Sequence, residues 1–382
     1  MIVIKVKICF IHWCLVAGGA ESALFDLVSL LDKNKFEITI FVIHRFGEWE
    51  DKFRKAGIRV ENLYSNIKGG NNKIEKAVKI LKIKHREYVF KKGGKGLLKL
   101  VFHENFDIVV SYHLHPPYFD IGIAGKKKIK YIHGNVCSNS SFGELIKSQS
   151  TYLKMYDKII CVSRAARDDF IKVTGIFDSV VSCYNPINTK KIKDLSMEVV
   201  HDIERAIDVP VLCVVSRLTE EKGVLRLISI HKKLLDNGLN HILYIIGDGK
   251  QRPIIEKEID RFNVLGSVKV LGYKANPYPY IKSSDIVVIP SYTEGMPVVA
   301  MEALCLGIPI VSSFKPIEEL FGESDCGVAT EADDDSLYNG LYRILSDKLF
   351  YNKIKSNAER RSLFFSSNNM IKIVEDIYLD LL

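Results

Sequence analysis

The chain has 382 residues, a length that indicates about two domains. Its 47% hydrophobic and 26% charged residues are those of an ordinary soluble globular protein, and no apolar run approaches the ~20 residues of a membrane span. The net charge of +8 is uneven: residues 1–190 hold 31 Lys and Arg against 18 Asp and Glu, whereas the remainder has a net charge of −5, so the two halves face different partners or fields.

The cysteines give no sign of a disulfide framework or of a metal site. There are eight of them, without a CxxC pair or a Cys/His cluster of metal-ligand spacing. Most lie in apolar runs that are typical of strands. They are expected to be reduced core thiols of a cytosolic protein, and no metal ion is expected.

The N-terminal run MIVIKVKICFI could belong to a signal peptide, but Lys5 and Lys7 alternate with apolar residues as in a strand, and His12 interrupts the run. We therefore predict a first strand over residues 3–11 and a helix from residue 20. Between them Gly18 and Gly19 either let the backbone approach a ligand at the start of the helix or form a simple tight turn. Further strands at 36–43 and 58–63, alternating with helices, indicate a doubly wound parallel sheet.

Residues 68–99 are strongly basic, with eleven Lys or Arg against two Glu interleaved with apolar residues. One interpretation is a solvated surface helix. The other is a basic amphipathic segment that lies on anionic lipid headgroups. Nucleic acid is disfavoured, because no nucleic-acid module accompanies the segment and the GGKG at 93–96 is not a P-loop. The candidate membrane-binding residues are Lys73, Lys76, Lys79, Lys82, Lys84 and Arg86.

Strand patterns recur around residues 107–112, 127–132, 158–162 and 179–183. The strand in KKKIKYIHGN ends at His133; a lone histidine is usually structural, but this one lies where open parallel sheets bind ligands. Ser163 is predicted to cap the helix that follows its strand. The polar stretch 189–205 is predicted to be a linker, with a first domain over 1–188 and a second over 206–367.

The second domain opens with a predicted strand over 209–215, a loop that contains Arg217 and Lys222, and a helix. If these two cations face the helix N-terminus described next, they could neutralise a diphosphate without a metal, the arginine as a fork and the lysine as a point charge. The alternative is two solvated loop cations.

Residues 285–313, DIVVIPSYTEGMPVVAMEALCLGIPIVSS, predict a strand, a loop, a helix that begins at Pro297 and ends at Gly307, and another strand. The backbone amides at the start of this helix can face an anion. Glu294 and Glu302 flank that place, and a carboxylate beside a phosphate needs donors such as sugar hydroxyls. Phosphate plus polyol indicates a sugar nucleotide, unless both glutamates are merely solvated.

With PSYTEGMPVVAMEALCLGIPIV, the chain resembles retaining glycosyltransferases of family 4, which have the GT-B fold and carry a Glu, seven residues, Glu motif in a PS..EG.P.V..EA...G.P.V context. The resemblance implies that Glu294 contacts hydroxyls of the donor sugar and that Glu302 holds the ribose. The residues that would bind the donor at the start of the helix are Gly295, Met296, Pro297 and Val298.

The same resemblance assigns the other candidates. Arg217 and Lys222 match the family's Arg and Lys-Gly pattern, which neutralises the diphosphate. Gly18 and Gly19 match a GGAE sequence that borders the acceptor and the donor phosphates, and His133 corresponds to a histidine that often contacts the transferred sugar. The candidate catalytic residues are Glu294, Arg217, Lys222 and His133.

For the whole chain, the resemblance implies two Rossmann-like doubly wound parallel-sheet domains facing a cleft, with a C-terminal helix, 368–382, that crosses back to the first domain. The DDD at 333–335 formally fits the DxD metal motif of the other main glycosyltransferase architecture, but its context predicts a helix cap and first turn.

The expected activity is retaining, metal-independent transfer of a hexose from a nucleotide-diphosphate donor, UDP-linked, with no cofactor. The expected acceptor is a lipid-linked oligosaccharide of capsule, exopolysaccharide or lipopolysaccharide biosynthesis. The enzyme is expected to be cytoplasmic and peripheral on the membrane. The alternatives are a GT-B-like nucleotide-sugar epimerase and a non-catalytic sugar-nucleotide-binding subunit.

Overall fold

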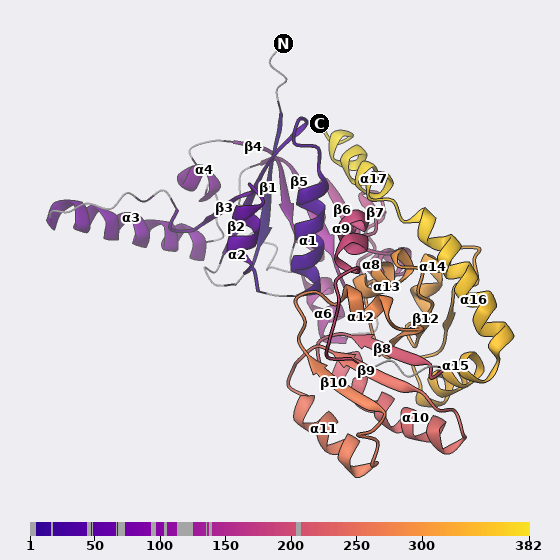
Figure 1. Cartoon of the computed structure of the whole chain (residues 1–382). Helices are drawn as coiled ribbons and strands as arrows, with labels where there is room; N and C mark the ends of the chain where they lie inside the picture. Colours follow the sequence, from indigo (N-terminus) through magenta and orange to yellow (C-terminus); the bar gives the residue numbers. More distant parts are fainter. Residues whose placement is uncertain are drawn as a thin grey trace. The chain divides into compact units, whose positions relative to one another are not determined.

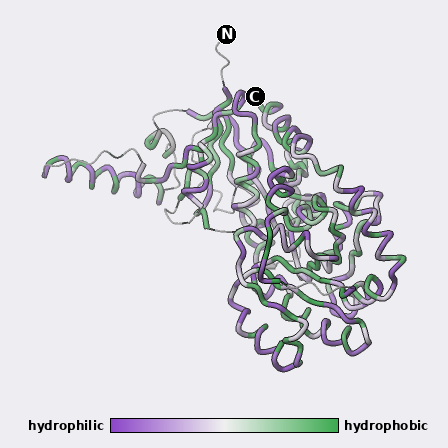
Figure 2. The backbone as a smooth tube through the Cα atoms, viewed as in Figure 1, coloured by the Kyte–Doolittle hydropathy of each residue, from purple (hydrophilic) through white to green (hydrophobic). Residues whose placement is uncertain are grey.

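The computed structural model describes residues 5–16, 18–43, 47, 49–65, 67, 73–92, 97–102, 105–112, 125–134, 136, 140–203 and 208–382. The chain divides into two compact units (Figure 1). Unit 1 comprises Met1–Pro186 and Asn368–Leu382, and unit 2 comprises Ile187–Ser367. Each unit has its own parallel sheet with helices around it, and Figure 2 shows hydrophobic residues concentrated along the strands.

Unit 1 has a seven-stranded parallel sheet in the order β3-β2-β1-β4-β5-β6-β7. The chain order reverses between β1 and β4, which pair directly, so the carboxyl ends of these two strands form the point where doubly wound sheets bind ligands. The predicted strands are confirmed. They are β1 (Val6–His12), β2 (Phe36–Val42), β3 (Arg59–Asn62), β4 (Phe106–Ser111), β5 (Gly125–Ile132), β6 (Lys158–Cys161) and β7 (Val180–Ser182).

The helices of unit 1 flank this sheet, and Ser163 caps one of them as predicted, because its hydroxyl accepts a hydrogen bond of 3.0 Å from the amide of Ala166. The helices are α1 (Gly19–Leu30), α2 (Glu50–Lys55), α3 (Lys73–Lys91), α4 (Leu97–Phe102), α6 (Ser140–Ser148), α7 (Ser150–Leu153), α8 (Arg164–Thr174) and α17 (Ser367–Leu379). Among the residues with described structure, no helix has both the length and the hydrophobicity needed to cross a bilayer.

The C-terminal helix α17 returns to unit 1, as predicted. Its apolar face enters the core with Val374 and Tyr378, and the Tyr378 hydroxyl lies 2.8 Å from that of Tyr131 on β5. Glu375 accepts hydrogen bonds from the amide of Asp32 (2.9 Å) and from the Lys35 ammonium group (2.8 Å). Chain segments more than 200 residues apart in sequence therefore share one core.

Unit 2 has a six-stranded parallel sheet in the order β10-β9-β8-β11-β12-β13. The chain order reverses between β8 and β11, so the two loops that follow these strands meet at the ligand-binding edge. The strands are β8 (Val211–Val215), β9 (Ile242–Ile246), β10 (Val268–Gly272), β11 (Ile286–Ile289), β12 (Ile310–Ser312) and β13 (Gly327–Ala329).

The helices of unit 2 include the predicted cap at 333–335: Asp333 accepts a hydrogen bond from the amide of Ser336 at 2.7 Å and begins α15, so the DDD sequence is a helix start. The helical segments are α9 (Thr189–Leu195), η1 (Glu220–Lys222), α10 (Val224–Asp236), α11 (Arg252–Arg261), α12 (Tyr278–Lys282), α13 (Val298–Cys305), η2 (Lys315–Ile317), α14 (Glu318–Phe321), α15 (Asp334–Ser346), α16 (Lys348–Arg361) and η3 (Ser362–Phe364).

The linker predicted over 189–205 is wrong for its first part. Residues 189–195 form α9, which Asn188 caps by accepting a hydrogen bond of 3.0 Å from the amide of Lys191. Ile192 is fully buried, and the amide of Thr189 donates to the Ser367 hydroxyl at 2.8 Å. The polar composition concealed one buried apolar residue and a helix cap, which together attach this segment to unit 2.

A buried histidine pair joins α10 to the starts of β9 and β10. His241 donates its Nδ1 proton to the Leu239 carbonyl, which leaves its Nε2 to accept a hydrogen bond of 2.7 Å from Nδ1 of His231. Nε2 of His231 lies 2.8 Å from the Ser267 hydroxyl. Burial, and to a lesser degree the neighbouring His241, lowers the pKa of His231 to about 3, so the pair is neutral in the native state.

We expect this pair to make the stability of unit 2 depend on pH. An unfolded histidine binds a proton below its ordinary pKa of 6.5, whereas native His231 does not. Its stabilising contribution is therefore complete above pH 6.5 and is lost as the pH falls toward 3, with a loss of about 2 kcal/mol in the free energy of unfolding by pH 5. Urea unfolding at pH 7 and pH 5 should show a smaller loss for His231→Gln than for the wild type.

The exposed His201 of the same unit provides the matched control. His201→Gln should keep the pH dependence of the wild type. Equal losses in the wild type and in His231→Gln would contradict the prediction.

Candidate functional site

The centre of the candidate site is an ion pair between the two loops at the switch point of unit 2. Lys222, in the loop after β8, donates to Oε1 of Glu294, in the loop after β11, over 2.6 Å. Both side chains are largely withdrawn from solvent, with 18% and 12% of their surfaces exposed. The Ser291 hydroxyl donates to the same carboxylate oxygen at 2.7 Å. The structure thus brings together two of the predicted residues and fixes the orientation of both.

The backbones of these loops also touch, which depends on Gly223. Gly223 has a left-handed φ of +64°, and a Cβ atom there would lie 2.0 Å from the carbonyl oxygen of Pro290. Two residues before Gly223 and two residues after Pro290, the loops are also joined by a hydrogen bond of 2.9 Å from the amide of Tyr292 to the carbonyl of Glu221. The position next to Lys222 must therefore be glycine for the lysine to reach Glu294.

Arg217 is near this pair in sequence but has a different partner. Its side chain is 66% exposed, and its Nη2 lies 3.4 Å from Oε1 of Glu221. Although burial acts in the opposite direction, the Thr219 hydroxyl and the nearby cations Arg217 and Lys222 hold the pKa of Glu221 below its ordinary value. Glu221 is therefore ionised, and Arg217 is an exposed cation in the same loop as Lys222.

The α13 helix begins at Val298, one residue later than predicted, because Pro297 has the extended conformation of a cap. Its first amides have no carbonyl partner one turn earlier in the helix, as at every helix start, and Gly295 and Met296 lead into this end. Glu302 is 9% exposed and accepts a hydrogen bond of 3.1 Å from the Tyr278 hydroxyl. The alternative that Glu302 is a solvated helix residue is therefore wrong.

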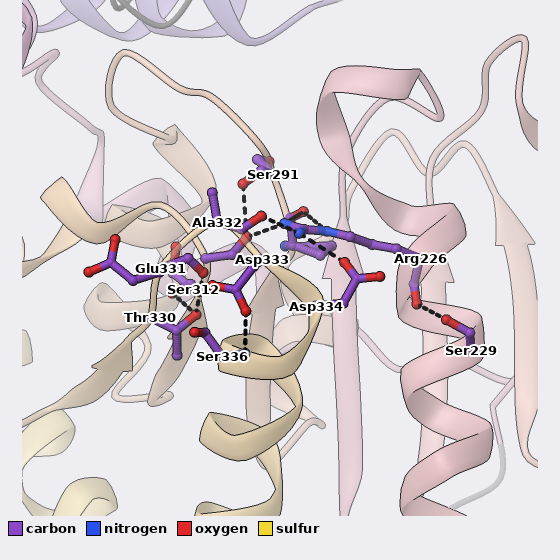
Figure 3. Close-up of polar contacts among 12 residues, drawn as sticks. Arg226, Ser229, Ser291, Ser312, Thr330, Glu331, Ala332, Asp333, Asp334 and Ser336 are labelled. Carbon is purple, nitrogen blue, oxygen red and sulfur yellow. Dashed lines mark hydrogen bonds and ion pairs between the residues drawn. The ribbon is translucent and has the colours of Figure 1, made fainter.

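Sequence reasoning missed Arg226, in the first turn of α10. Its guanidinium group is almost fully buried at this edge of the sheet, and Figure 3 shows it directed toward Ala332 and Asp334. The predicted helix covered this position, but no role was predicted for Arg226. The sequence feature that could have pointed to a role for Arg226 is its position, four residues after Lys222 and within the first turn of a helix at the ligand-binding edge.

Three predicted residues lie at the corresponding edge of unit 1. Gly18 caps α1 with an extended backbone, and a Cβ atom there would lie 2.5 Å from Oε2 of the buried Glu21, whereas Gly19 has open space. Glu21 in turn lies 3.8 Å from Nε2 of His12. His133 follows β5, donates from Nε2 to the carbonyl of Tyr112 at 2.7 Å, and has its ring in a fixed orientation.

The predicted membrane-binding set is corrected at one position. Arg86 is 6% exposed and donates hydrogen bonds to the carbonyls of Leu63, Ser65 and Leu100, so it attaches α3 to unit 1 and cannot meet a lipid surface. The five lysines are exposed, as the prediction requires; they are Lys73, Lys76, Lys79, Lys82 and Lys84. Among the residues that the structure describes, no cluster of His, Cys, Asp or Glu could hold a metal ion.

Comparison with known proteins covers both units. Residues 17–191 match the family described as Glycosyltransferase Family 4, and residues 200–361 match Glycosyl transferases group 1. Anabaena HepE, solved in complex with UDP-glucose, has the same fold, with a TM-score of 0.73 at 18% identity and coverage of 99% of this chain and 100% of that chain. This likeness confirms the predicted architecture.

Curated relatives match at higher identity over part of the chain. An uncharacterized glycosyltransferase of Methanocaldococcus jannaschii is 32% identical over 243 residues, which are 59% of this chain and 61% of the relative. A UDP-Gal:alpha-D-GlcNAc-diphosphoundecaprenol alpha-1,3-galactosyltransferase of Escherichia coli is 30% identical over 179 residues, 45% of this chain and 46% of that protein. The chain spans about half the length of the curated relatives it matches.

The contact between the two loops predicts an unequal response to alanine at two left-handed glycines. Gly238 has a φ of +79° and no atom within 4 Å of the place that a Cβ atom would take, so Gly238→Ala should cost only the backbone strain, about 1 kcal/mol of unfolding free energy. Gly223→Ala adds a clash with Pro290 and should cost roughly 1–3 kcal/mol more. Urea unfolding of the two variants measures the difference, and equal costs would show that the loops do not depend on this close approach.

Proposed function

Because the chain belongs to the family 4 type of GT-B glycosyltransferases, we propose that it is a retaining enzyme that transfers a hexose from a UDP-sugar to a lipid-linked oligosaccharide in surface polysaccharide biosynthesis. The observation that carries the proposal is the contact of Lys222 with Glu294 at the switch point of unit 2. A cation for phosphate and a carboxylate for hydroxyls lie side by side, next to a helix N-terminus.

The donor would bind with its diphosphate between Lys222 and the start of α13. Arg217, exposed and paired with Glu221, can turn toward the same phosphates as a second cation. Glu302 would accept a hydrogen bond from the ribose, since Tyr278 already holds its carboxylate in one orientation. A uridine nucleotide is the donor class that agrees with HepE, solved with UDP-glucose, and with the relative named for UDP-Gal.

In the proposed reaction, the bond from the sugar C1 to the phosphate oxygen breaks as the acceptor hydroxyl attacks from the same face. The departing phosphate takes the acceptor proton, so the products are UDP and a glycoside of unchanged anomeric configuration. Lys222, Arg217 and the amides at the start of α13 stabilise the charge that grows on the diphosphate. Glu294 orients the sugar, and no step requires a divalent cation. The resemblance to family 4 enzymes would give His133 and the Gly18–Gly19 turn roles in contacting the acceptor and the transferred sugar.

A lipid-linked acceptor is supported by the relative named for a diphosphoundecaprenol substrate and by the surface of α3. Ile74, Val78 and Leu81 recur every three or four residues, so they form one stripe, and Ile74 and Leu81 are 77% and 66% exposed. At about 100° per residue, the stripe lies roughly 110° around the helix from Arg86, so it is on a different face from the one that Arg86 attaches to unit 1. Because the fold leaves these residues uncovered and lysines flank them, we propose that α3 lies on an anionic membrane.

We expect transfer to survive chelation and to depend on Lys222. With UDP-hexoses and a diphosphoundecaprenol-linked GlcNAc acceptor, millimolar EDTA should leave the turnover rate unchanged. Lys222→Met should lower the turnover rate by about 10²–10³-fold, because it removes a charge that acts on the leaving group. Lys257→Met, which removes an exposed lysine of α11, should have no effect. Loss of turnover with EDTA would overturn the metal-independent mechanism.

The same incubation separates the proposal from its alternatives. An epimerised UDP-sugar formed without acceptor would indicate an epimerase, and UDP-sugar binding without any product would indicate a binding subunit. NMR of the new glycoside reports its anomeric configuration, and inversion would exclude the retaining mechanism.

Vesicle flotation tests the membrane surface. The wild type should float with vesicles that contain phosphatidylglycerol and much less with phosphatidylcholine alone. Replacing Lys76, Lys79 and Lys82 by Gln should weaken binding by about 100-fold, since each lysine near an anionic surface contributes about 1 kcal/mol. Ile74→Ser with Leu81→Ser should also weaken it.

Three exposed lysines of unit 1 outside α3 provide the control for net charge. The triple variant Lys147→Gln, Lys154→Gln and Lys172→Gln should float like the wild type. If both triple variants float equally, α3 is not the membrane-binding surface.

A further inference from the structure

Arg226 connects three loops at the ligand-binding edge of unit 2. Its Nε and Nη2 donate to the carbonyl of Pro290 at 3.1 and 2.7 Å, and Nη2 also donates to the Ser313 hydroxyl at 2.7 Å. Nη1 donates to the carbonyl of Ala332 at 2.6 Å and to Asp334 at 3.2 Å. These acceptors follow β11, β12 and β13 in turn, and Figure 3 shows the Arg226 side chain extending from α10 toward Ala332 and Asp334.

Most of these contacts fix the short segment 290–292. Besides the two bonds to Pro290, the guanidinium carbon of Arg226 lies 4.0 Å from the centre of the Tyr292 ring, in a cation–π contact. The Ser313 hydroxyl, which Arg226 contacts, lies 2.8 Å from the carbonyl oxygen of Ser291. The amide of Tyr292 donates to Glu221. Each of the three residues is therefore held from the side of α10 or β12.

This segment ends two residues before Glu294. The hydroxyl of Ser291, within the segment, donates directly to the Glu294 carboxylate, and Lys222 ends η1 four residues before Arg226 in α10. Arg226 therefore has no contact with Glu294 in the structure but holds the residues that place it, on the same chain segment that supplies Lys222.

We propose that Arg226 is a positioning residue of the transfer reaction, which holds segment 290–292 so that Glu294 faces the donor sugar. The inference rests on the proposed function. A buried charge with five hydrogen bonds would be a costly way to fill space, since a long apolar side chain packs without desolvating a cation. The planar fork reaches carbonyls of two loops and a hydroxyl of a third at once, which a lysine cannot do.

The test compares Arg226→Met, Arg226→Lys and a control. Arg343→Met is the control, because Arg343 also stacks on an aromatic ring, that of Phe350, but is exposed on α15. With UDP-hexose and acceptor, Arg226→Met should lower kcat by about 100-fold, because a small displacement of a reacting group has this effect, while KM for the donor changes less than threefold. Arg226→Lys should recover part of kcat, and Arg343→Met should be unchanged.

Amide hydrogen exchange provides a readout that does not require activity. In Arg226→Met, amides of residues 291–296 should exchange at least tenfold faster than in the wild type, while β8 and β9 keep their protection. If exchange accelerates equally throughout unit 2 in both Arg226 variants, the residue serves only stability and the inference is overturned.

Wild-type kcat with unchanged exchange in Arg226→Met would overturn the inference while leaving the proposed function intact. Conversely, if the wild-type protein transfers no hexose, the proposed function is wrong. The difference in amide exchange of residues 291–296 between the wild type and Arg226→Met would still show whether Arg226 holds this loop.

Discussion

The partly buried ion pair between Lys222 and Glu294 is the interaction on which the candidate site depends. Two opposite charges largely withdrawn from water stabilise each other only when geometry and further hydrogen bonds are good, and removing one partner leaves the other charge uncompensated. The Ser291 hydroxyl supplies the further hydrogen bond. The pair therefore requires that the loops after β8 and β11 be held in register, and much of the surrounding structure does this.

The strand order of the sheet alone makes those two loops neighbours, independently of their side chains. Parallel strands wind outward in both directions from β8 and β11, so their two following loops share one edge without a strand between them. Gly223 then permits backbone contact, and Arg226 fixes the loop after β11 from α10, the helix that follows the loop after β8. In unit 1 the candidate residues also lie at the carboxyl ends of parallel strands, but they are two glycines and a histidine in place of an ion pair. The turn that contains Gly18 follows β1 at the switch point of this sheet, and His133 follows β5.

The two units have opposite net charges, and the structure gives this asymmetry a location. Much of the positive excess of unit 1 lies on α3, whose lysines and apolar stripe are exposed, whereas its one arginine is used internally. A basic face on one unit and the Lys222 site on the other agree with the proposed lipid-anchored acceptor and nucleotide donor.

The sequence by itself determined the alternating strands and helices, the caps at Ser163 and Asp333, the return of the C-terminal helix, and the two loops that contain Arg217, Lys222 and Glu294, because each depends on local periodicity or on a short motif. Only the tertiary structure decided which charges are buried. By their local pattern, Arg86 and Arg226 resemble surface residues of amphipathic helices, and the stretch 189–195 resembles a linker. Local composition does not show which hydrogen-bond acceptors are provided by loops that are distant in sequence. Whether a charged side chain faces water or a cage of carbonyls is set by packing between distant segments, which a local pattern does not contain.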